Sequence, residues 1–307
     1  MNDKAALKGH TAGNGETAVN DKASAHGMTA VCGVCFRHCR IEEGRLGACR
    51  ARRAENGRVV CDNYGRITSI ALDPIEKKPL ARFHGGSMIL SVGSYGCNLT
   101  CPFCQNDSIS YAGPDDVGYR TVNPEDLADI ALSVKDRGNI GLAFTYNEPL
   151  VGWEFVKDTA EEVHRRGMLN VMVTNGCAEL SVLDELLPHI DAMNIDLKCF
   201  TDDSYRRLGG DFEMVKAFIS RAADACHVEL TTLIVPGLND SEKDMEREAE
   251  WIASLRGGRG DEIPLHVTRF FPRHDYIGKA PTDVRTVRGL ADKARETLKY
   301  VYVGNVW

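Results

Sequence analysis

Apolar runs of strand length alternate with amphipathic stretches along most of the chain, and the amphipathic stretches have the 3.6-residue period of helices. The predicted strands are Met88–Val92, Ile140–Thr145, Leu169–Thr174, Ala192–Leu197, Val228–Val235 and Leu265–Phe270. The predicted helices are Pro124–Asp136, Val151–Arg166, Leu180–Leu187, Asp211–Ala225 and Ser241–Leu255, followed by a last helix over Thr282–Leu298 and a short strand over Tyr300–Asn305. This alternation predicts crossover units around a parallel sheet, and six repeats suit an open or partial (βα) barrel in an α/β fold.

The chain before this pattern divides into two further parts. Residues 1–28 are rich in Ala, Gly, Asn, Lys and Thr and contain little that can pack, so we expect a disordered tail. Residues 29–86 form a cysteine-rich segment and a connector, and residues 87–307 form the barrel. Within the connector, Asp73 to Pro79 is a charged stretch between two prolines, which favours a rigid turn that presents Glu76, Lys77 and Lys78.

Composition narrows the possible functions without selecting one. Hydrophobic residues make up 43% and charged residues 26%, as in ordinary soluble globular proteins. The net charge of −7 offers no basic footprint for nucleic acid. No apolar run is long enough to span a bilayer, and no leader sequence is apparent, so we expect a cytoplasmic protein without membrane contact. In such a protein the 11 cysteines are better explained as metal ligands and reduced thiols than as disulfides.

The most informative motif is the loop after the first predicted strand, where three cysteines have the spacing C-x3-C-x2-C: Cys97, Cys101 and Cys104. Gly96 lets the chain turn out of the strand, and Pro102 stiffens the loop. A cubane [4Fe–4S] cluster normally takes four thiolates. A loop with three therefore predicts a cluster with one iron left open, as catalytic metal sites keep one position open. The alternative is a structural zinc knuckle or three unrelated buried cysteines.

A second cysteine group lies upstream and consists of Cys32, Cys35, Cys39 and Cys49. Four thiolates in a segment too short for its own core satisfy either a tetrahedral zinc ion or a fully ligated iron–sulfur cluster. The spacing does not decide between these two metals. A group of reduced buried thiols is the alternative.

Polar residues follow the predicted strands at their carboxyl ends, where ligands bind in parallel α/β sheets. Glu148 is a suitable partner for an ammonium group, although Asn-Glu-Pro also starts helices. Asp196 and Lys198 share one face of their strand, either bound to a charged ligand or joined in a structural salt bridge. His266 is either a ligand contact or a satisfied core histidine.

The loop Gly96-Cys97 to Cys104, followed by Gln105-Asn106, resembles the signature of radical S-adenosylmethionine (SAM) enzymes. This resemblance implies a partial (βα)6 TIM-like barrel of the radical SAM type, with a small N-terminal cysteine-rich metal-binding segment. It also implies that the open iron chelates the methionine part of SAM and that one electron cleaves SAM to a 5′-deoxyadenosyl radical. The SAM contacts that it implies are Asn147, Glu148, Thr174, Asn175, Asp196, Lys198 and His266.

Across Cys32 to Asn305 the motifs closely resemble AmmeMemoRadiSam system radical SAM enzymes, which are relatives of pyruvate formate-lyase (glycyl radical enzyme) activases. The supporting strings include Asp73-Pro-Ile-Glu-Lys-Lys-Pro79 and Thr-Tyr-Asn-Glu-Pro149. The resemblance implies an electron donor such as flavodoxin or ferredoxin, and Memo-like and AMMECR1-like partners. It leaves the substrate, a protein or a small molecule, unidentified. A glycyl radical enzyme activase is the first alternative function, and a non-catalytic iron–sulfur or zinc electron carrier or scaffold is the second.

Overall fold

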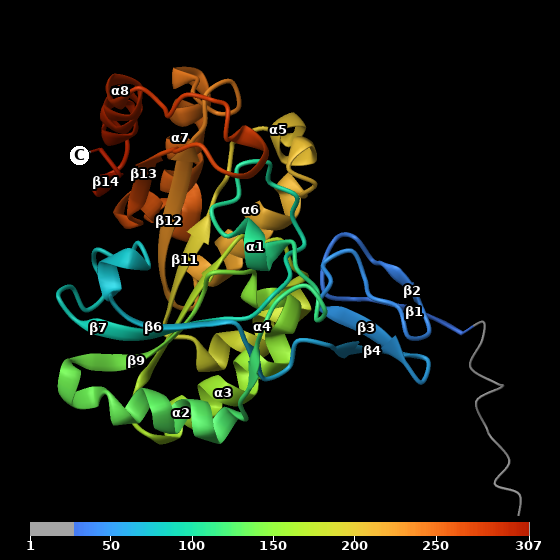
Figure 1. Cartoon of the computed structure of the whole chain (residues 1–307). Coiled ribbons are helices and arrows are strands. Elements are labelled where there is room, and N and C mark those ends of the chain that lie inside the picture. The colour runs from blue at the N-terminus through green and yellow to red at the C-terminus, as the bar shows by residue number, and fades with distance from the viewer. Residues whose placement is uncertain (1–27, 307) are drawn as a thin grey trace, which may run out of the picture.

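The computed structural model describes residues 28–306, so the predicted tail falls, except for Met28, outside the described residues. The centre of the molecule is an eight-stranded sheet with the order β14-β13-β12-β11-β10-β9-β7-β6 (Figure 1). Strands β7 to β14 of this sheet pair in parallel, and β6 pairs antiparallel with β7. Because β14 and β6 are its two edges, the sheet is an open, partial barrel.

The predicted strands are present, and each begins and ends within one residue of its expected position. The strands of the central sheet are β6 (Ser69–Pro74), β7 (Met88–Gly93), β9 (Asn139–Phe144), β10 (Leu169–Thr174), β11 (Ala192–Asp196), β12 (His227–Ile234), β13 (Leu265–Arg269) and β14 (Val301–Gly304). The short last strand, β14, joins the sheet parallel to β13. The barrel therefore has one more parallel strand than the six that the sequence predicts.

Helices connect the parallel strands and cover the outside of the sheet (Figure 1). They are α1 (Asp107–Ser110), α2 (Pro124–Ser133), α3 (Trp153–Arg165), α4 (Leu180–Leu186), α5 (Asp202–Arg207), α6 (Phe212–Ala223), α7 (Glu242–Gly258) and α8 (Val284–Arg295). All six predicted helices are present, whereas α1 and α5 were not predicted. As expected, the Asn123 side chain caps α2 and Pro124 occupies its first turn. Within residues 28–306 no helix is long and apolar enough to cross a membrane.

The cysteine-rich segment forms small antiparallel hairpins beside the barrel (Figure 1). Strand β1 (Thr29–Val31) pairs with β2 (Arg40–Glu42), and β3 (Arg52–Glu55) pairs with β4 (Arg58–Cys61). A third pair, β5 (Arg66–Ile67) with β8 (Arg120–Thr121), ties the segment to the chain that follows the cysteine loop. The central sheet itself begins at Ser69, inside the predicted connector.

The charged connector does not form the exposed turn that the sequence predicts. Ile75 and Leu80 are fully buried, and they anchor the short 3₁₀ turn η1 (Ile75–Lys77) against the inside of the sheet. This burial draws Lys78 inward, where its Nζ lies 3.0 Å from Asp73 Oδ2 and over the Tyr146 ring. The segment from Pro74 to Leu80, which its two prolines stiffen, thus forms a plug inside the barrel. Of the predicted charged group, only Glu76 and Lys77 stay exposed.

Glu229, near the start of β12, fixes this plug. Its carboxylate accepts hydrogen bonds from the backbone N–H groups of Ala81 (2.9 Å) and Arg82 (2.7 Å). The His227 and His266 imidazoles contact the same carboxylate at 3.0 and 2.7 Å. Burial works against the carboxylate charge, but these hydrogen bonds outweigh it and lower the pKa of Glu229 to about 2. The connector therefore closes the amino-terminal end of the barrel with paired groups.

Candidate active site at the carboxyl ends of the strands

The cysteine loop leaves β7 through Gly96, which has a φ of +89°. A Cβ atom here would lie 2.5 Å from the Cys49 carbonyl oxygen, so the position requires glycine for both conformation and space. The Asn147 side chain, which follows the end of β9, hydrogen-bonds to the backbone of the same stretch, residues 94–96. Its amide donates to the Tyr95 and Gly96 carbonyls, both at 3.1 Å, and its oxygen accepts from the Ser94 N–H at 2.8 Å.

Two apolar residues inside the loop decide which way its cysteines face. Leu99 and Phe103 are buried, and the Phe103 ring packs against Phe270 and Tyr276. The three cysteines Cys97, Cys101 and Cys104 alternate with these anchors and remain partly exposed. The spacing C-x3-C-x2-C is therefore compatible with a loop that buries its apolar residues while its thiols line one cavity.

That cavity is a cleft of about 270 Å³ at the carboxyl ends of the strands, near the lower end of the roughly 300–1,000 Å³ typical of small-molecule sites. It brings the three loop cysteines together with six of the seven predicted SAM contacts. These six are Asn147, Glu148, Thr174, Asn175, Asp196 and Lys198. Its lining comes from six successive parallel strands, β7 and β9 to β13, and so lies at the end of the sheet where the topology predicts a ligand site.

Glu148 is the most buried acid of the cleft, at 3% exposure. Its carboxylate accepts hydrogen bonds from the Thr174 hydroxyl (2.5 Å), the Asn175 N–H (2.8 Å) and the Leu150 N–H (3.1 Å). Glu148 also caps the 3₁₀ turn η3 (Pro149–Gly152), so the helix-starting role considered above is present as well. Burial nevertheless raises the pKa of Glu148 to about 7, since these hydrogen bonds only partly offset it.

Asp196 and Lys198 both face the cleft from the end of β11, as their period of two predicts. The Lys198 Nζ lies 2.6 Å from Asp196 Oδ2. Burial disfavours the lysine cation, but Asp196 and the neighbouring cysteine thiolates outweigh this cost and raise the pKa of Lys198. The pair is therefore a salt bridge at the cleft wall that keeps a positive charge beside the cysteine loop.

Two of the predicted SAM contacts, His266 and Asn147, have protein partners in this structure. His266 is outside the described lining of the cleft. It contacts Glu229 and stacks on Tyr302, which is the core role that the sequence left open. The polar atoms of Asn147 are taken up by the loop backbone, so this side chain positions the loop although it lines the cleft. The alternation of side chains along a strand shows which face of β13 carries His266, but it does not show how close the residue lies to the carboxyl end of the strand.

Sequence reasoning missed several residues that line the cleft. Thr268 stands two residues beyond His266 on the same face of β13, and Thr231 lies on β12. Tyr146 has a φ of +72°, and its hydroxyl donates to Asp73 at 2.8 Å. The positions of Thr231 and Thr268 on their strands could have identified them as cleft residues. Tyr146 had no such signal, because its partner Asp73 lies 73 residues away in the sequence.

The chemistry of the loop fits an iron–sulfur cluster. Burial raises the pKa of Cys97 well above its usual range and that of Cys101 to about 12. Such thiols ionise readily only when a cation replaces their protons, as metal binding does. In the described part of the chain, no three Cys, His, Asp or Glu side chains are placed to share a single metal ion. The loop thiols instead face a cleft with room for a larger group.

The four upstream cysteines behave differently. Cys32, Cys35, Cys39 and Cys49 line a small cavity of about 10 Å³, together with apolar residues such as Val34, Ile41 and Val151 and with Arg37 and Arg52. Burial, with a smaller contribution from the neighbouring cysteines, raises the pKa of Cys49 to about 12. Cys61 is outside this lining and donates its S–H to Asn63. His38 pairs with Glu179 at 3.3 Å instead of joining the thiols.

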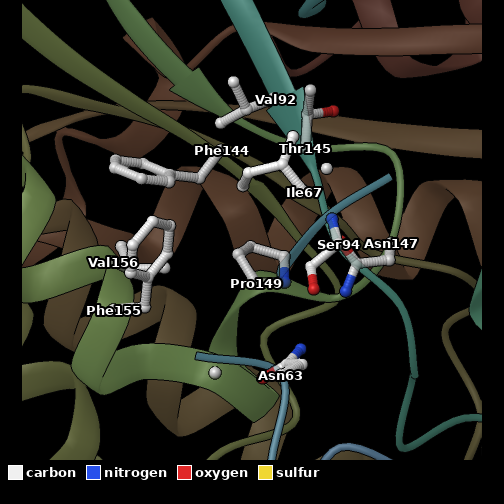
Figure 2. A pocket seen from close by; sticks show the side chains of 12 residues that line it. Asn63, Ile67, Val92, Ser94, Phe144, Thr145, Asn147, Pro149, Phe155 and Val156 are labelled. Atoms are coloured by element: carbon white, nitrogen blue, oxygen red, sulfur yellow. The ribbon is translucent and has the colours of Figure 1, made fainter. Parts of the chain in front are cut away.

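A separate small cavity of about 30 Å³ lies behind the cysteine loop, between β7, β9 and α3 (Figure 2). Its walls are mainly Ile67, Val92, Phe144, Phe155 and Val156, and Ser94 and Asn147 lie side by side at its edge. It has room for about one water molecule. A cavity of this size cannot accept a cofactor, so the cleft in front of the loop is the candidate active site.

Sequence comparisons place relatives beside this chain. The Radical SAM superfamily matches the chain over residues 91–252. The chain is 39% identical over 285 residues to an uncharacterized protein of Methanocaldococcus jannaschii, MJ0808, covering 90% of this chain and 81% of that protein. It is 28% identical over 178 residues to the pyruvate formate-lyase-activating enzyme of Clostridium pasteurianum, covering 56% of this chain and 72% of the enzyme.

Solved structures share the fold at low sequence identity. SuiB of Streptococcus suis has a TM-score of 0.53 at 13% identity, covering 69% of this chain and 47% of that one. HydG, a maturase of the [FeFe]-hydrogenase, has a TM-score of 0.52 at 14% identity, covering 68% and 49%. With the superfamily match spanning more than half of the residues, the chain belongs to the radical SAM superfamily, whose members are enzymes that use a [4Fe–4S] cluster and S-adenosylmethionine.

Proposed function

We propose that Cys97, Cys101 and Cys104 hold a [4Fe–4S] cluster whose open iron binds SAM within the cleft. When reduced by one electron, the cluster and SAM supply a 5′-deoxyadenosyl radical that abstracts hydrogen from a substrate. The observation that carries the proposal is the single cleft that three thiols share with polar residues from successive strand ends.

The residues of the cleft divide the binding of SAM among them. Glu148 is a buried carboxylate without a cationic partner in direct contact, which suits the amino group of SAM. Lys198 offers a positive charge for the SAM carboxylate, and Asp196 keeps that lysine charged. Thr231 and Thr268 present hydroxyls toward the remainder of the ligand. Thr268 takes the role that the sequence assigned to His266.

Hydrogen bonds between these residues preorganise the cleft. The Thr174 hydroxyl and the Asn175 N–H both donate to Glu148 and so fix its carboxylate. The Asn175 side-chain amide in turn lies 3.7 Å from the Cys97 sulfur. The position of the SAM amino group is thereby tied to that of the cluster.

At a finer level, we propose that the enzyme belongs to the AmmeMemoRadiSam system and acts on a protein or small molecule at the cleft. Memo-like and AMMECR1-like proteins are its proposed partners, and flavodoxin or ferredoxin its proposed electron donor. We also propose that His274, whose ring lies 4.6 Å from the Tyr111 ring beside the loop, contacts the substrate. All 11 cysteines are free thiols, which supports a reducing compartment such as the cytoplasm.

Activation of a glycyl radical enzyme is the second candidate function. It is favoured by the 24% identity over 216 residues to the pyruvate formate-lyase 1-activating enzyme of Escherichia coli K12. This match covers 67% of the chain and 83% of that enzyme. The appearance of a glycyl radical signal on a partner, incubated with reduced protein and SAM, is the test. A non-catalytic carrier is less well supported, since it has no use for Glu148, Asp196 or Lys198.

The decisive experiment compares the wild type with the Cys97→Ala/Cys101→Ala/Cys104→Ala protein, both purified without oxygen. Iron, zinc and acid-labile sulfide are measured per chain, and 5′-deoxyadenosine is measured after addition of SAM and dithionite. We expect the triple change to remove about four iron and four sulfide, one cubane's worth, and all 5′-deoxyadenosine. Cys226→Ala, a change at a partly buried thiol outside the cleft, is the matched control. Unchanged iron content in the triple variant would reject the proposal.

A further inference from the structure

Arg37, from the cysteine-rich segment, hydrogen-bonds to the loop that carries the three cleft cysteines. Its guanidinium donates from Nε to the Asn98 carbonyl and from Nη2 to the Gly209 carbonyl, both at 2.8 Å. Asn98 directly follows Cys97 in the sequence. One planar side chain thus joins the cysteine loop to the turn between α5 and α6, although Arg37 is outside the described lining of the cleft.

The turn between α5 and α6 leaves room for this guanidinium. Gly209 has a φ of +67°, and a Cβ atom there would lie 2.7 Å from Arg37 Nη2 and 2.6 Å from the Thr100 hydroxyl oxygen. The position therefore requires glycine for both conformation and space. The Thr100 N–H donates to the Leu208 carbonyl at 2.8 Å, so the turn and the cysteine loop are joined a second time.

The Asn98 side chain fixes the other side of the same residue. Asn98 is 1% exposed, and its Nδ2 donates to the Cys177 carbonyl at 2.7 Å. Its Oδ1 accepts from the Asn175 Nδ2 at 3.0 Å. Since the side chain and the backbone carbonyl are both hydrogen-bonded, the peptide unit that follows Asn98 is held in one orientation.

That peptide unit links Arg37 to one of the predicted cluster ligands. Its carbonyl belongs to Asn98 and accepts the Arg37 hydrogen bond. Its N–H belongs to Leu99 and donates to the Cys97 sulfur at 3.4 Å. A charged donor on the carbonyl polarises the amide and strengthens its N–H as a donor, because hydrogen bonds in a chain reinforce one another. Hydrogen bonds to the sulfurs and nearby charge both affect the reduction potential of an iron–sulfur cluster.

We propose that Arg37 is a positioning residue that raises the reduction potential of the loop cluster through the peptide between Asn98 and Leu99. Reduction adds one negative charge to the cluster and its thiolates. The strengthened N–H bond to the Cys97 sulfur stabilises that charge, and the charge of the guanidinium acts in the same direction. The cysteine-rich segment thereby makes the cluster easier to reduce from outside the cleft. This inference rests on the proposed function, because it needs a cluster on the loop.

Redox titration of Arg37→Gln tests the inference. Anaerobic protein is poised at a series of potentials with dithionite, and the electron paramagnetic resonance signal that changes on addition of SAM, that of the loop cluster, is followed. We expect the ratio of reduced to oxidised loop cluster at a given potential to fall roughly tenfold, or about 59 mV for one electron, with iron content unchanged. Arg37→Lys keeps the charge and should restore part of the fall. Arg40→Gln, at an exposed arginine on β2, changes the net charge equally and is the matched control.

Each outcome of the titration decides for or against the inference. An unchanged reduction potential in Arg37→Gln, with iron retained, overturns it and leaves the proposed function intact. If Arg37→Gln loses the loop iron, Arg37→Lys decides, and its potential must lie below that of the wild type. Loss of iron from both variants would assign Arg37 to cluster assembly and overturn the inference as well. If the triple cysteine change removes no iron compared with the wild type, the proposed function fails instead.

Labelling of leucine with nitrogen-15 tests the N–H bond to sulfur in the wild type itself. Pulsed electron paramagnetic resonance of the reduced protein should show a coupling between the cluster and the Leu99 amide nitrogen. Leu99→Met, which keeps the N–H group but not the label, should remove this coupling, and Arg37→Gln should weaken it. No coupling in the wild type, or an equal coupling in Arg37→Gln, overturns the route through the peptide.

Discussion

The two ends of the barrel each bury a glutamate, and the two carboxylates differ sharply. Glu229, at the amino-terminal end, accepts two backbone N–H groups and contacts two imidazoles, and its pKa falls to about 2. Glu148, at the carboxyl end, accepts one hydroxyl and two backbone N–H groups, and its pKa rises to about 7. The lower carboxylate is satisfied by the protein itself.

The upper carboxylate lacks the imidazoles and depends on a positive charge that the protein does not place against it. Lys198, the nearest cation of the cleft, favours the ionised form of Glu148 from a distance but pairs directly with Asp196. In the proposed function, the ammonium group of SAM supplies the missing charge. The same fold thus uses one buried acid to close the barrel and keeps another ready for a ligand.

Glu229→Gln breaks the lower half of this comparison and has the largest expected effect. The amide has one acceptor atom and brings an N–H group toward the Ala81 and Arg82 donors, so the connector loses its attachment. We expect a loss of about 3–5 kcal/mol in the free energy of unfolding, measured by denaturant titration. Per folded molecule, the affinity for SAM stays the same. Glu246→Gln, on the exposed side of α7, is the control; equal stabilities would show that the plug is held without Glu229.

Glu148→Gln breaks the upper half. The amide keeps the shape of the side chain but loses its charge, and with it the attraction for the SAM amino group. We expect SAM binding to weaken by roughly 10- to 100-fold, or about 1.5–3 kcal/mol, in equilibrium dialysis on the reconstituted protein. Iron content does not change. Stability falls less than in Glu229→Gln: the amide leaves one N–H donor of the cleft without an acceptor, but it also removes the cost of burying a carboxylate without a paired cation.

Glu185→Gln, on the exposed surface of α4, is the matched control for that measurement. Wild-type affinity for SAM in Glu148→Gln would assign the amino group to another partner. It would also reduce Glu148 to the cap of η3 that the sequence left open as the alternative.

The parallel core of the fold was predictable from sequence, since each strand is a continuous apolar run whose ends are marked by polar residues. The plug was not. Asp-Pro and the charges of the connector favour an exposed turn, and only the tertiary burial of Ile75 and Leu80 reverses this. Strand β6 was missed for the same reason, because its partner β7 supplies the antiparallel pairing that its own pattern does not specify.

The candidate site was predictable to the same limit. Spacing identified the three cysteines, and the cleft contains six of the seven polar residues that the sequence predicted as SAM contacts. The depth of His266 was not available, since an alternating pattern shows which face a residue occupies but not which end of the barrel it approaches. The hydrogen bond from Arg37 to the Asn98 carbonyl joins segments 61 residues apart, and no local pattern contains it.

A third buried acid sharpens the comparison through pH. Glu248, at 2% exposure, contacts the Thr232 hydroxyl, and burial raises its pKa to about 8. The folded protein therefore holds a proton that the unfolded chain releases near pH 4.5, so this group lowers stability as pH rises from 4.5 to 8. We expect the stability of the wild type relative to Glu248→Gln to fall by about 1 kcal/mol per pH unit between pH 5.5 and 7.5. Parallel pH profiles in urea titrations would contradict this.

The smallest expected effect separates two neighbours on one strand face. Thr268 lines the upper cleft, whereas His266, two residues earlier on β13, belongs to the Glu229 contacts below. Thr268→Val removes one hydroxyl and should weaken SAM binding by up to roughly tenfold, with little change in stability. His266→Gln should do the opposite: it lowers the free energy of unfolding by about 1 kcal/mol and leaves SAM affinity unchanged. If His266→Gln weakens SAM binding and Thr268→Val does not, the SAM site extends two residues further toward the amino-terminal end of β13 than the structure indicates. His266 would then make the SAM contact that the sequence predicts.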